Sequence, residues 1–212
     1  MNIGIFGATG QVGGVMRKLV IERKLGVDDV RFFASARSAG TKISFGDRIV
    51  TVEDAGVADF SGIDIALFSA GKAASLSLAE KAVAAGAIVI DNSSAWRMDP
   101  EVPLVVTEVN PEALDDARKG IVANPNCTTM VAMAVVKPLQ DRFGLRSIVV
   151  STYQAVSGAG LAGVAELEAQ INGAGGLQSR LTYDGAALPA AAQDVFGEPI
   201  AFNVIPFVGS LV

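Results

Sequence analysis

A glycine-rich turn between a short β-like run and a helical pattern constrains the fold of this chain more than any other feature. The run Asn2–Phe6 is typical of a strand, and apolar side chains recur at helical spacing from Gln11 to about Arg23. The turn Gly7–Gly13 lies at their junction and has glycine at every third position. A strand, a glycine turn and a helix in this order begin a βαβ unit, which predicts a mostly parallel sheet.

The alternation of strands and helices continues through residue 123. Short β-branched or apolar runs predict strands at 30–34, 63–69, 87–91, 102–106 and 120–123, with an irregular strand or hairpin at 43–52. A helix is expected at 72–85, where an alanine-rich sequence ends at Gly86. The predicted fold is therefore α/β, with a Rossmann-like, doubly wound and mostly parallel sheet.

The sequence changes character after the last of these strands. Asn124 begins a polar break, a helix is expected from about 128 to 142, and a strand is expected at 147–153. Charged residues become rare after Ser151. We predict two domains, 1–124 and 125–212. The run 200–212 is nearly all apolar and is typical of a strand that continues, so we expect it to belong to a longer polypeptide.

Two residue counts exclude several kinds of active site. The chain has no histidine, so it can form neither a Ser-His or Cys-His pair nor a His-ligated metal site. Its one cysteine, Cys127, excludes intrachain disulfides and multi-cysteine zinc or iron–sulfur sites. We therefore expect no metal centre. A single thiol suits a reducing compartment, which favours the cytoplasm.

Charge and hydropathy exclude two classes of partner. The formal net charge is −5, and the basic residues are scattered, so there is no electrostatic footprint for nucleic acid. No apolar run reaches the roughly 18 residues of a membrane-spanning helix, and we see no signal peptide before the first strand. We expect a protein that binds neither nucleic acid nor a membrane.

The glycine turn suits a dinucleotide. Gly7 permits a tight turn, and Gly10 lets backbone N–H groups approach a pyrophosphate at the positive helix N-terminus. Gly13 lets the helix pack closely on the strand. The spacing G-x-x-G-x-x-G is a variant of the usual G-x-G-x-x-G. The alternative is an ordinary connection between a strand and a helix.

The end of the second predicted strand indicates which dinucleotide. An NAD site usually has an Asp or Glu there that accepts a hydrogen bond from the ribose 2′-OH. Residues 33–38 contain no acid, and Arg37 lies between Ser35 and Ser38, a set of donors that suits a 2′-phosphate. This favours NADP over NAD. The alternative is that Arg37 is a solvated loop residue.

Cys127 is the candidate nucleophile. A lone cysteine is usually a small buried hydrophobe, and that alternative stays open. However, Cys127 follows the polar run Asn124–Asn126 and lies at a helix start, where the macrodipole stabilises a thiolate. On a doubly wound sheet this turn and the glycine turn lie at the same edge. A thiolate there could attack an aldehyde, and loss of hydride to NADP⁺ would leave a thioester.

Other polar residues fit an acyl-transfer site. Arg97 ends a polar run after a predicted strand, and it could hold an oxyanion such as phosphate or pair with Asp99 or Glu101. Gln154 offers an amide for substrate positioning, with a surface glutamine as the alternative. Ser157–Gly160 is a second glycine turn before a helix and could approach the cofactor.

Five stretches, taken in order, resemble aspartate-β-semialdehyde dehydrogenase over essentially the whole chain. They are residues 7–13, 32–38, 91–97, 124–129 and 153–160. The resemblance implies an N-terminal NADP-binding domain and the start of an α+β domain that is catalytic and forms a homodimer. It also implies reversible, NADP- and phosphate-dependent conversion of L-aspartate 4-semialdehyde to L-4-aspartyl phosphate. That step supplies lysine, methionine, threonine and diaminopimelate biosynthesis.

Residue roles follow from the matching motifs. Cys127 would be the acyl-thioester nucleophile, Gln154 and Asn126 would contact the substrate, and Arg97 would bind phosphate or the phosphoryl group. The motifs and the glycine turn together predict these cofactor-binding residues: Gly7, Thr9, Gly10, Gln11, Val12, Gly13, Arg37, Ser38, Ser157 and Gly158. A small-molecule substrate, phosphate and a second copy of the chain are the expected partners.

The chain departs from the family in one respect. The family uses a histidine as acid/base, an arginine that holds the substrate carboxylate and a lysine on the phosphate, all in its C-terminal half. The chain contains no histidine. We therefore expect an N-terminal portion with little activity by itself, because positioned proton transfer contributes about 10²–10⁴-fold.

Two other functions stay open. N-acetyl-γ-glutamyl-phosphate reductase uses the same thioester chemistry on a longer substrate, although residues 92–97 and 153–160 favour the aspartate enzyme. A catalytically inactive NADP-binding or dimerisation module that ends at Val212 is the alternative from another class.

Overall fold

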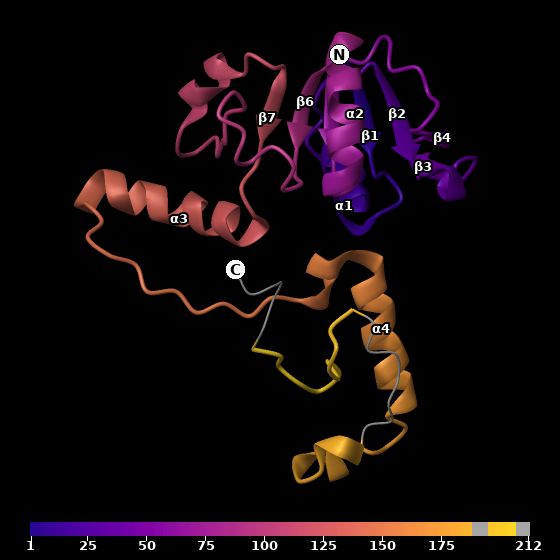
Figure 1. The fold of residues 1–212 in the computed structure, drawn as a ribbon, viewed down its shortest axis with the longest axis vertical. Helices are drawn as coiled ribbons and strands as arrows, with labels where there is room; N and C mark the ends of the chain where they lie inside the picture. Colours follow the sequence, from indigo (N-terminus) through magenta and orange to yellow (C-terminus); the bar gives the residue numbers. More distant parts are fainter. Residues whose placement is uncertain (188–194, 207–212) are drawn as a thin grey trace. The chain divides into compact units, whose positions relative to one another are not determined.

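The computed structural model describes residues 1–187 and 195–206, which belong to two units, Met1–Val149 and Val150–Val212. In the first unit, seven strands form one sheet in the order β3-β4-β2-β1-β5-β6-β7 (Figure 1). The strands are β1 (Asn2–Phe6), β2 (Asp29–Ala34), β3 (Lys42–Phe45), β4 (Arg48–Asp54), β5 (Ile65–Phe68), β6 (Ile88–Asp91) and β7 (Ile121–Ala123).

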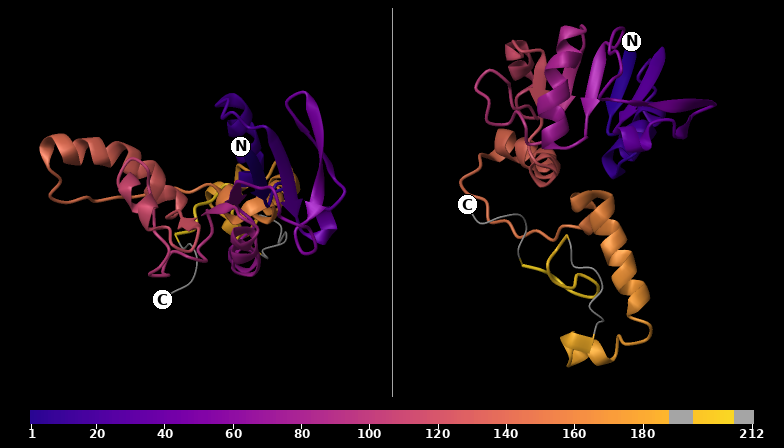
Figure 2. Two further views of the ribbon diagram at one scale, coloured as in Figure 1. Left: turned by 90° about the horizontal axis from the view of Figure 1, so that it is seen from above. Right: turned by 45° about the vertical axis from the view of Figure 1, so that its right-hand side comes forward.

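All neighbouring strands are parallel except β3 and β4, which form an antiparallel hairpin. This hairpin lies at the edge of the sheet opposite β7 (Figure 2). The predicted α/β class and the doubly wound, mostly parallel sheet are confirmed. For residues 43–52 the sequence allows an irregular strand or a hairpin, and the structure has the hairpin, with two regular strands.

Two of the helices connect strands where the sequence predicts them, between β1 and β2 and between β5 and β6. Among the described residues the α-helices are α1 (Gln11–Glu22), α2 (Lys72–Ala84), α3 (Cys127–Phe143) and, in the second unit, α4 (Gly160–Gly173). Short 3₁₀ turns occur at η1 (Ala36–Ser38), η2 (Pro111–Asp116), η3 (Val156–Ala159), η4 (Arg180–Thr182) and η5 (Gly185–Ala187).

The apolar core covers both faces of the sheet, because successive side chains of a strand point to opposite faces. Ile3 and Ile5 of β1 belong to one buried cluster, which also contains Val20 of α1. Phe6 belongs to the other cluster, together with Leu78 of α2. Two-sided burial explains why these strands are apolar at nearly every position.

A stack of aromatic rings fixes the end of β1. Phe6 lies between Phe33 of β2 and Phe68 of β5, with ring centroids 4.5 and 4.1 Å away. Phe60 packs edge-on against Phe6 at 5.0 Å. The three stacked rings are fully buried and directly opposite in the strand register. The glycine turn therefore starts from a fully buried, closely packed position of the sheet.

Two buried polar side chains of α4 hold a later segment of the second unit. Glu166 accepts a hydrogen bond from the backbone N–H of Val195 at 2.8 Å. The side-chain oxygen of Gln170 accepts from the N–H groups of Ile200 and Ala201 at 2.8 and 2.9 Å. Buried amides need such partners, so Glu166 and Gln170 tie residues 195–201 to the helix.

Replacing Gln170 with leucine is expected to release this segment. The change leaves two backbone N–H groups without their acceptor, which costs about 1–3 kcal/mol for each group that stays buried. Hydrogen exchange at the amides of Ile200 and Ala201 should become about tenfold faster or more. Gln178→Leu, at an exposed position of the same unit, is the matched control. Unchanged exchange in Gln170→Leu would contradict the prediction.

Two predicted strands are wrong. Residues 147–153 form no strand in the described part of the chain, and the side chains of Val149 and Tyr153 are 98% and 86% exposed. A β-branched run becomes a strand only where a neighbouring segment supplies hydrogen-bond partners, and no described residue does so. Residues 102–106 make only a single bridge, between Leu104 and Ala123.

Three other expectations have different outcomes. Residues 200–206 contain no strand, and 207–212 lie outside the described residues, so the expected strand is wrong where it can be examined. The domain division at 124 stays a prediction. In the described ranges, no helix combines the length and the hydropathy needed to cross a membrane.

Candidate active site

Parallel strands bring the loops that follow them to one edge of the sheet, the carboxyl edge. The chain runs from β1 to β2 on one side and later to β5 on the other, so the strand order reverses at β1. Ligands of such sheets bind outside the carboxyl ends of the strands at this reversal. The loops at this edge include Gly7–Gly10 after β1, Ser35–Ser38 after β2, Ser69–Gly71 after β5, Asn92–Ser94 after β6 and Asn124–Asn126 after β7.

The glycine turn needs its first glycine for two reasons. Gly7 has φ +82°, a conformation that L side chains rarely adopt. A Cβ on Gly7 would also lie 2.4 Å from the carbonyl oxygen of Ser69, so the loops after β1 and β5 are in contact. The N–H groups of Gly7 and Ala8 both donate to the carbonyl of Phe33, at 2.8 and 3.1 Å, which ties the turn to β2.

The start of α1 fits a pyrophosphate. A Cβ on Gly13 would lie 2.2 Å from the carbonyl oxygen of Gly7 and 2.8 Å from Cα of Ala8, so the helix backbone packs directly on the turn. Gly10 is the N-cap residue and supplies no side-chain hydrogen bond, and the first turn has no acid. The first amides of α1 are therefore left for an anionic group, as a dinucleotide requires.

Arg37 lies one strand away from the glycine turn. It is exposed in η1, directly after β2, and β2 is the neighbour of β1. The N–H of Ser38 donates to the carbonyl of Ser35 at 2.8 Å, which closes this short turn. The structure thus brings Arg37 and Ser38 to the same edge as the glycines, on the β2 side.

Cys127 is exposed at the first position of α3. Asn126 is the N-cap residue, and its side-chain oxygen accepts hydrogen bonds from the N–H of Thr129 at 2.9 Å and the hydroxyl of Thr128 at 3.0 Å. The polar residues around the thiol therefore form a helix cap. Because Cys127 is exposed, the alternative of a buried packing residue is wrong for this structure.

Arg97 joins the loops after β6 and β7. Its Nε donates to the carbonyl of Asn124 at 2.8 Å, and its Nη2 donates to the carbonyl of Asn92 at 3.0 Å. Its guanidinium is only partly buried, and its remaining N–H groups can donate to another acceptor. The structure thus brings Arg97 next to the turn that carries Cys127.

The alternative partners of Arg97 are paired elsewhere. Lys119 lies 2.7 Å from a carboxylate oxygen of Asp99 and 3.1 Å from one of Glu101. The hydrogen bond from Lys119, followed by one from the backbone N–H of Glu101, holds the pKa of Asp99 below its ordinary value. The hydrogen bonds of the Lys119 ammonium to Asp99, first, and to the Glu101 carboxylate raise the pKa of Lys119.

The other predicted site residues lie in the second unit. Gln154, Ser157 and Gly158 form one local turn before α4, because a Cβ on Gly158 would lie 2.4 Å from the side-chain nitrogen of Gln154. The N–H of Gly158 donates to the carbonyl of Ala155 at 3.2 Å. This turn and the carboxyl edge belong to different units.

Sequence reasoning did not identify two features of the carboxyl edge. One is the loop Ser69–Gly71, which touches Gly7; a glycine between a strand and a helix at the reversal of strand order would have indicated it. The other is the hydrogen bond from the side-chain amide of Asn124 to the side-chain oxygen of Asn92. No residue pattern indicates that contact, because the two residues lie on different loops.

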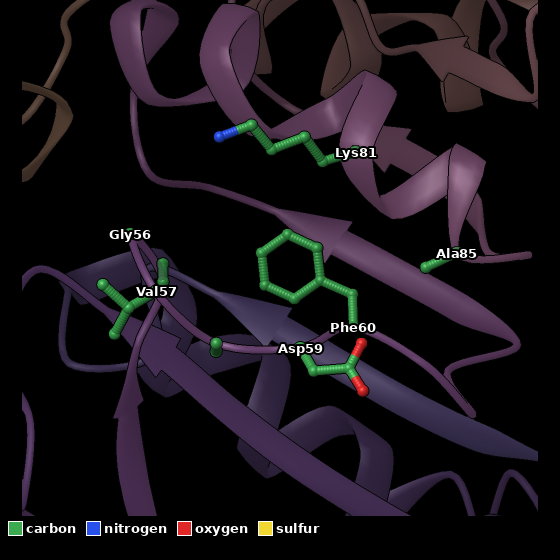
Figure 3. Close-up of a pocket in the computed structure, with 8 residues that line it drawn as sticks. Gly56, Val57, Asp59, Phe60, Lys81 and Ala85 are labelled. Atoms are coloured by element: carbon green, nitrogen blue, oxygen red, sulfur yellow. The ribbon is translucent and has the colours of Figure 1, made fainter.

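A separate hollow of about 260 Å³ lies between the loop after β4 and α2 (Figure 3). Phe60 lies between the loop and the helix, and Asp59 and Lys81 contribute charged groups to the lining. None of the predicted site residues lines this hollow. In the part of the chain that the structure describes, no group of three or more His, Cys, Asp or Glu side chains could hold a metal ion.

Two family models match the chain. Residues 2–117 match the semialdehyde dehydrogenase NAD-binding domain, so this unit binds a nicotinamide dinucleotide. Residues 136–212 match the semialdehyde dehydrogenase dimerisation domain.

Curated relatives match over the whole chain. Aspartate-semialdehyde dehydrogenase of Streptomyces akiyoshiensis is 59% identical over 212 residues, which are 100% of this chain and 62% of that protein. The enzyme of the same name from Corynebacterium glutamicum is 54% identical over 214 residues, with the same shares. The chain thus spans about 62% of the length of these relatives.

Solved structures agree with the curated relatives. Aspartate semialdehyde dehydrogenase II from Vibrio cholerae, complexed with ASA, matches with a TM-score of 0.89 and 42% identity over 100% of this chain and 60% of that chain. The aspartate semialdehyde dehydrogenase of Candida albicans, solved with NADP, matches 68% of this chain and 48% of that chain, with a TM-score of 0.54 and 27% identity. The sequence resemblance is confirmed, and this chain belongs to the semialdehyde dehydrogenase family.

Proposed function

We propose that these residues are the cofactor-binding part and the nucleophile-bearing part of an aspartate-semialdehyde dehydrogenase. The complete enzyme would convert L-aspartate 4-semialdehyde, phosphate and NADP⁺ into L-4-aspartyl phosphate and NADPH, as a step in amino-acid biosynthesis. The observation that carries the proposal is an exposed thiol at a helix start on the same sheet edge as a dinucleotide-binding glycine turn. The 59% identity to a protein of that name supports the choice of substrate.

The sheet order supports a particular direction for the cofactor. The pyrophosphate would bind the amides at the start of α1, with Gly7, Thr9, Gly10, Gln11, Val12 and Gly13 around it. The adenosine half would extend toward β2, where Arg37 and Ser38 would hold a 2′-phosphate. The nicotinamide half would extend toward β5, β6 and β7. Cys127 follows β7, three strand spacings or about 14 Å from β1.

Cys127 would carry the acyl group. Its thiolate attacks the aldehyde carbon and forms a C–S bond, and the carbonyl electron pair moves to oxygen. A bound nicotinamide would supply a hydride acceptor, and loss of hydride from the former aldehyde carbon would leave a thioester on Cys127. The side-chain amide of Gln154 would orient the substrate.

Phosphate would then release the product. Arg97 would hold the phosphate, because the free N–H groups of its guanidinium can donate to the phosphate oxygens, and Asn126 beside it would contact the substrate. A phosphate oxygen attacks the thioester carbon, the C–S bond breaks, and the thiolate of Cys127 leaves. Ser157 and Gly158 would approach the cofactor from the second unit.

Proton transfer would need the histidine that the family resemblance implies as acid/base. The chain has no histidine, so we expect this group to come from outside these residues. We expect the chain by itself to turn over slowly for this reason. We place the complete enzyme in the cytoplasm as a homodimer, because a lone thiol suits a reducing compartment and residues 136–212 match a dimerisation domain.

The direct test uses a completed protein, made by joining these residues to the C-terminal part of the Streptomyces akiyoshiensis relative. L-aspartate 4-semialdehyde should produce NADPH only when phosphate is present. N-acetyl-glutamate semialdehyde should react much more slowly. Equal turnover of the two semialdehydes, or turnover that does not require phosphate, would contradict the proposal.

Arg37→Ala tests the choice of NADP. Removing a guanidinium from a phosphate costs about 1.5–3 kcal/mol, so the Kd for NADPH should rise about 10- to 100-fold. The Kd for NADH should change little, because NADH has no 2′-phosphate. Isothermal titration of the chain with each dinucleotide gives both values. Arg23→Ala, at the far end of α1, is the control. Equal losses for NADPH and NADH would remove the argument for a 2′-phosphate site.

A further inference from the structure

The turn that carries Cys127 is attached to the end of β6 and the segment after it by several hydrogen bonds. The backbone N–H of Asn124 donates to the carbonyl of Asp91 at 2.9 Å. Its side-chain amide donates to the side-chain oxygen of Asn92. Its carbonyl accepts from Arg97 at 2.8 Å, and Arg97 also holds the carbonyl of Asn92 at 3.0 Å. Asn124 therefore uses its backbone donor on the last residue of β6, and its backbone acceptor and side chain on the segment that follows β6.

The loop after β6 is itself held from within the core. Asp91 is completely buried, and its carboxylate accepts from the N–H of Ser93 at 3.0 Å and from the Ser93 hydroxyl at 2.7 Å. That hydroxyl accepts from the N–H of Ala95 at 3.1 Å. A buried carboxylate with fixed donors makes a rigid turn. The turn is therefore a firm support for Asn92 and Arg97.

Few free torsions separate Asn124 from the thiol. Pro125 has its φ fixed by the ring. Asn126 is held by the cap that its side chain makes with the N–H of Thr129. No residue of α3 is fully buried, so packing along the helix gives Cys127 little support in the described structure. The position of Cys127 is thus set mainly through Asn124.

We propose that Asn92 and Asn124 are positioning residues for Cys127, which together with Arg97 form a clamp between the loops after β6 and β7. Arg97 then has two tasks. Its Nε and one Nη2 hydrogen hold the two carbonyls, and its remaining N–H groups bind the phosphate of the proposed reaction. The clamp itself is read from these contacts, whereas the orientation of the thiol toward the cofactor rests on the proposed function.

Hydrogen exchange in the cofactor-free chain tests the clamp. Asn92→Leu removes the acceptor of the Asn124 amide, and exchange at the N–H groups of Asn124, Thr129 and Met130 should become about tenfold faster. Asn92→Asp keeps a side-chain acceptor and should stay within about twofold of the unaltered chain. Asn110→Leu is the matched control, since Asn110 makes similar side-chain bonds to Leu104 and Val106 on a different loop.

Cofactor protection tests the orientation of the thiol. Saturating NADP⁺ should slow alkylation of Cys127 by iodoacetamide in the unaltered chain and in Asn92→Asp. In Asn92→Leu this protection should be lost while the Kd for NADP⁺ stays the same. A merely structural role for Asn92 would change the fold or the affinity, and it would not selectively remove the protection.

Each result has a definite meaning. Unchanged exchange in Asn92→Leu, or equally faster exchange throughout β1, overturns the clamp. Protection that survives in Asn92→Leu overturns its role in positioning the thiol. If NADP⁺ fails to protect Cys127 even in the unaltered chain, the proposed function fails and so does the orientation of the thiol, while the exchange experiment still decides the clamp.

Discussion

Gly13→Ala is expected to destabilise the first unit by about 3 kcal/mol and to weaken dinucleotide binding at least tenfold. The added methyl carbon would lie 2.2 Å from the carbonyl oxygen of Gly7 and 2.8 Å from Cα of Ala8. Both atoms belong to the backbone, so no side-chain rotation relieves the overlap. Inserting a methyl group into a packed site costs about 1–3 kcal/mol, and this contact is closer than any that real Cβ atoms make.

The loss of binding follows from the same displacement. If α1 moves away from the turn, its first amides no longer point at the position of the pyrophosphate. Urea denaturation measures the change in the free energy of unfolding. Titration with NADPH, carried out well below the denaturation midpoint, measures the change in affinity.

Gly14→Ala is the matched control for this prediction. It adds the same methyl group to the next residue of the same helix, where the nearest atom is Nη2 of Arg17 at 3.6 Å. Alanine is a better helix former than glycine by up to about 1 kcal/mol, so this variant should be as stable as the unaltered chain or slightly more stable. Equal stability of the two variants would show that α1 does not pack on the turn as described.

The fold of the first unit could be predicted from sequence because its determinants are local. Alternating β-branched and helical runs, each ended by a turn residue, indicate strands and helices, and the parallel sheet follows from their order. The predicted helices at 72–85 and about 128–142 differ from α2 and α3 by a single residue at any end. The sequence does not decide between an irregular strand and a hairpin at 43–52, because an excursion at the sheet edge has no periodicity of its own.

The strand wrongly predicted at 147–153 shows that local sequence cannot determine whether a segment has a neighbouring strand to pair with. Its residues have strong β propensity, but propensity describes the fit to a sheet and does not create the neighbouring strand. Val149 is almost fully exposed for this reason.

The sequence predicts which residues form the candidate site better than it predicts the hydrogen bonds that these residues make. The thiol of Cys127, the guanidinium of Arg97 and the missing side chains of the glycines each indicate a role from residue type alone. The strand order then brings their loops to one edge of the sheet. Which hydrogen bonds Arg97 makes could not be predicted, because its neighbours Asp99 and Glu101 are closer in sequence than Asn124. Lys119 engages both carboxylates, and Arg97 turns to two backbone carbonyls instead.

Cys127→Ser in the completed protein is expected to lower turnover by about 10⁴-fold or more while leaving the Kd for NADPH unchanged. A serine hydroxyl ionises far less readily than a thiol and needs a neighbouring base, and these residues offer no histidine. When several catalytic residues act as a unit, removing the nucleophile alone loses most of the rate enhancement that the whole set provides. The substitution is nearly isosteric, and Cys127 is exposed, so folding should be unaffected.

Trapping the acyl group distinguishes a Cys127 that carries it from a Cys127 that only lies near the reacting carbon. Acid quenching during turnover, followed by mass spectrometry, should find the acyl thioester on the peptide that contains Cys127 and nowhere else. The serine variant should give no such adduct. Met133→Leu, a similar-sized change two helical turns into α3, should keep both turnover and the adduct. Turnover above about a tenth of the original rate in Cys127→Ser would mean that the thiol does not carry the acyl group, and the proposed mechanism would have to be given up.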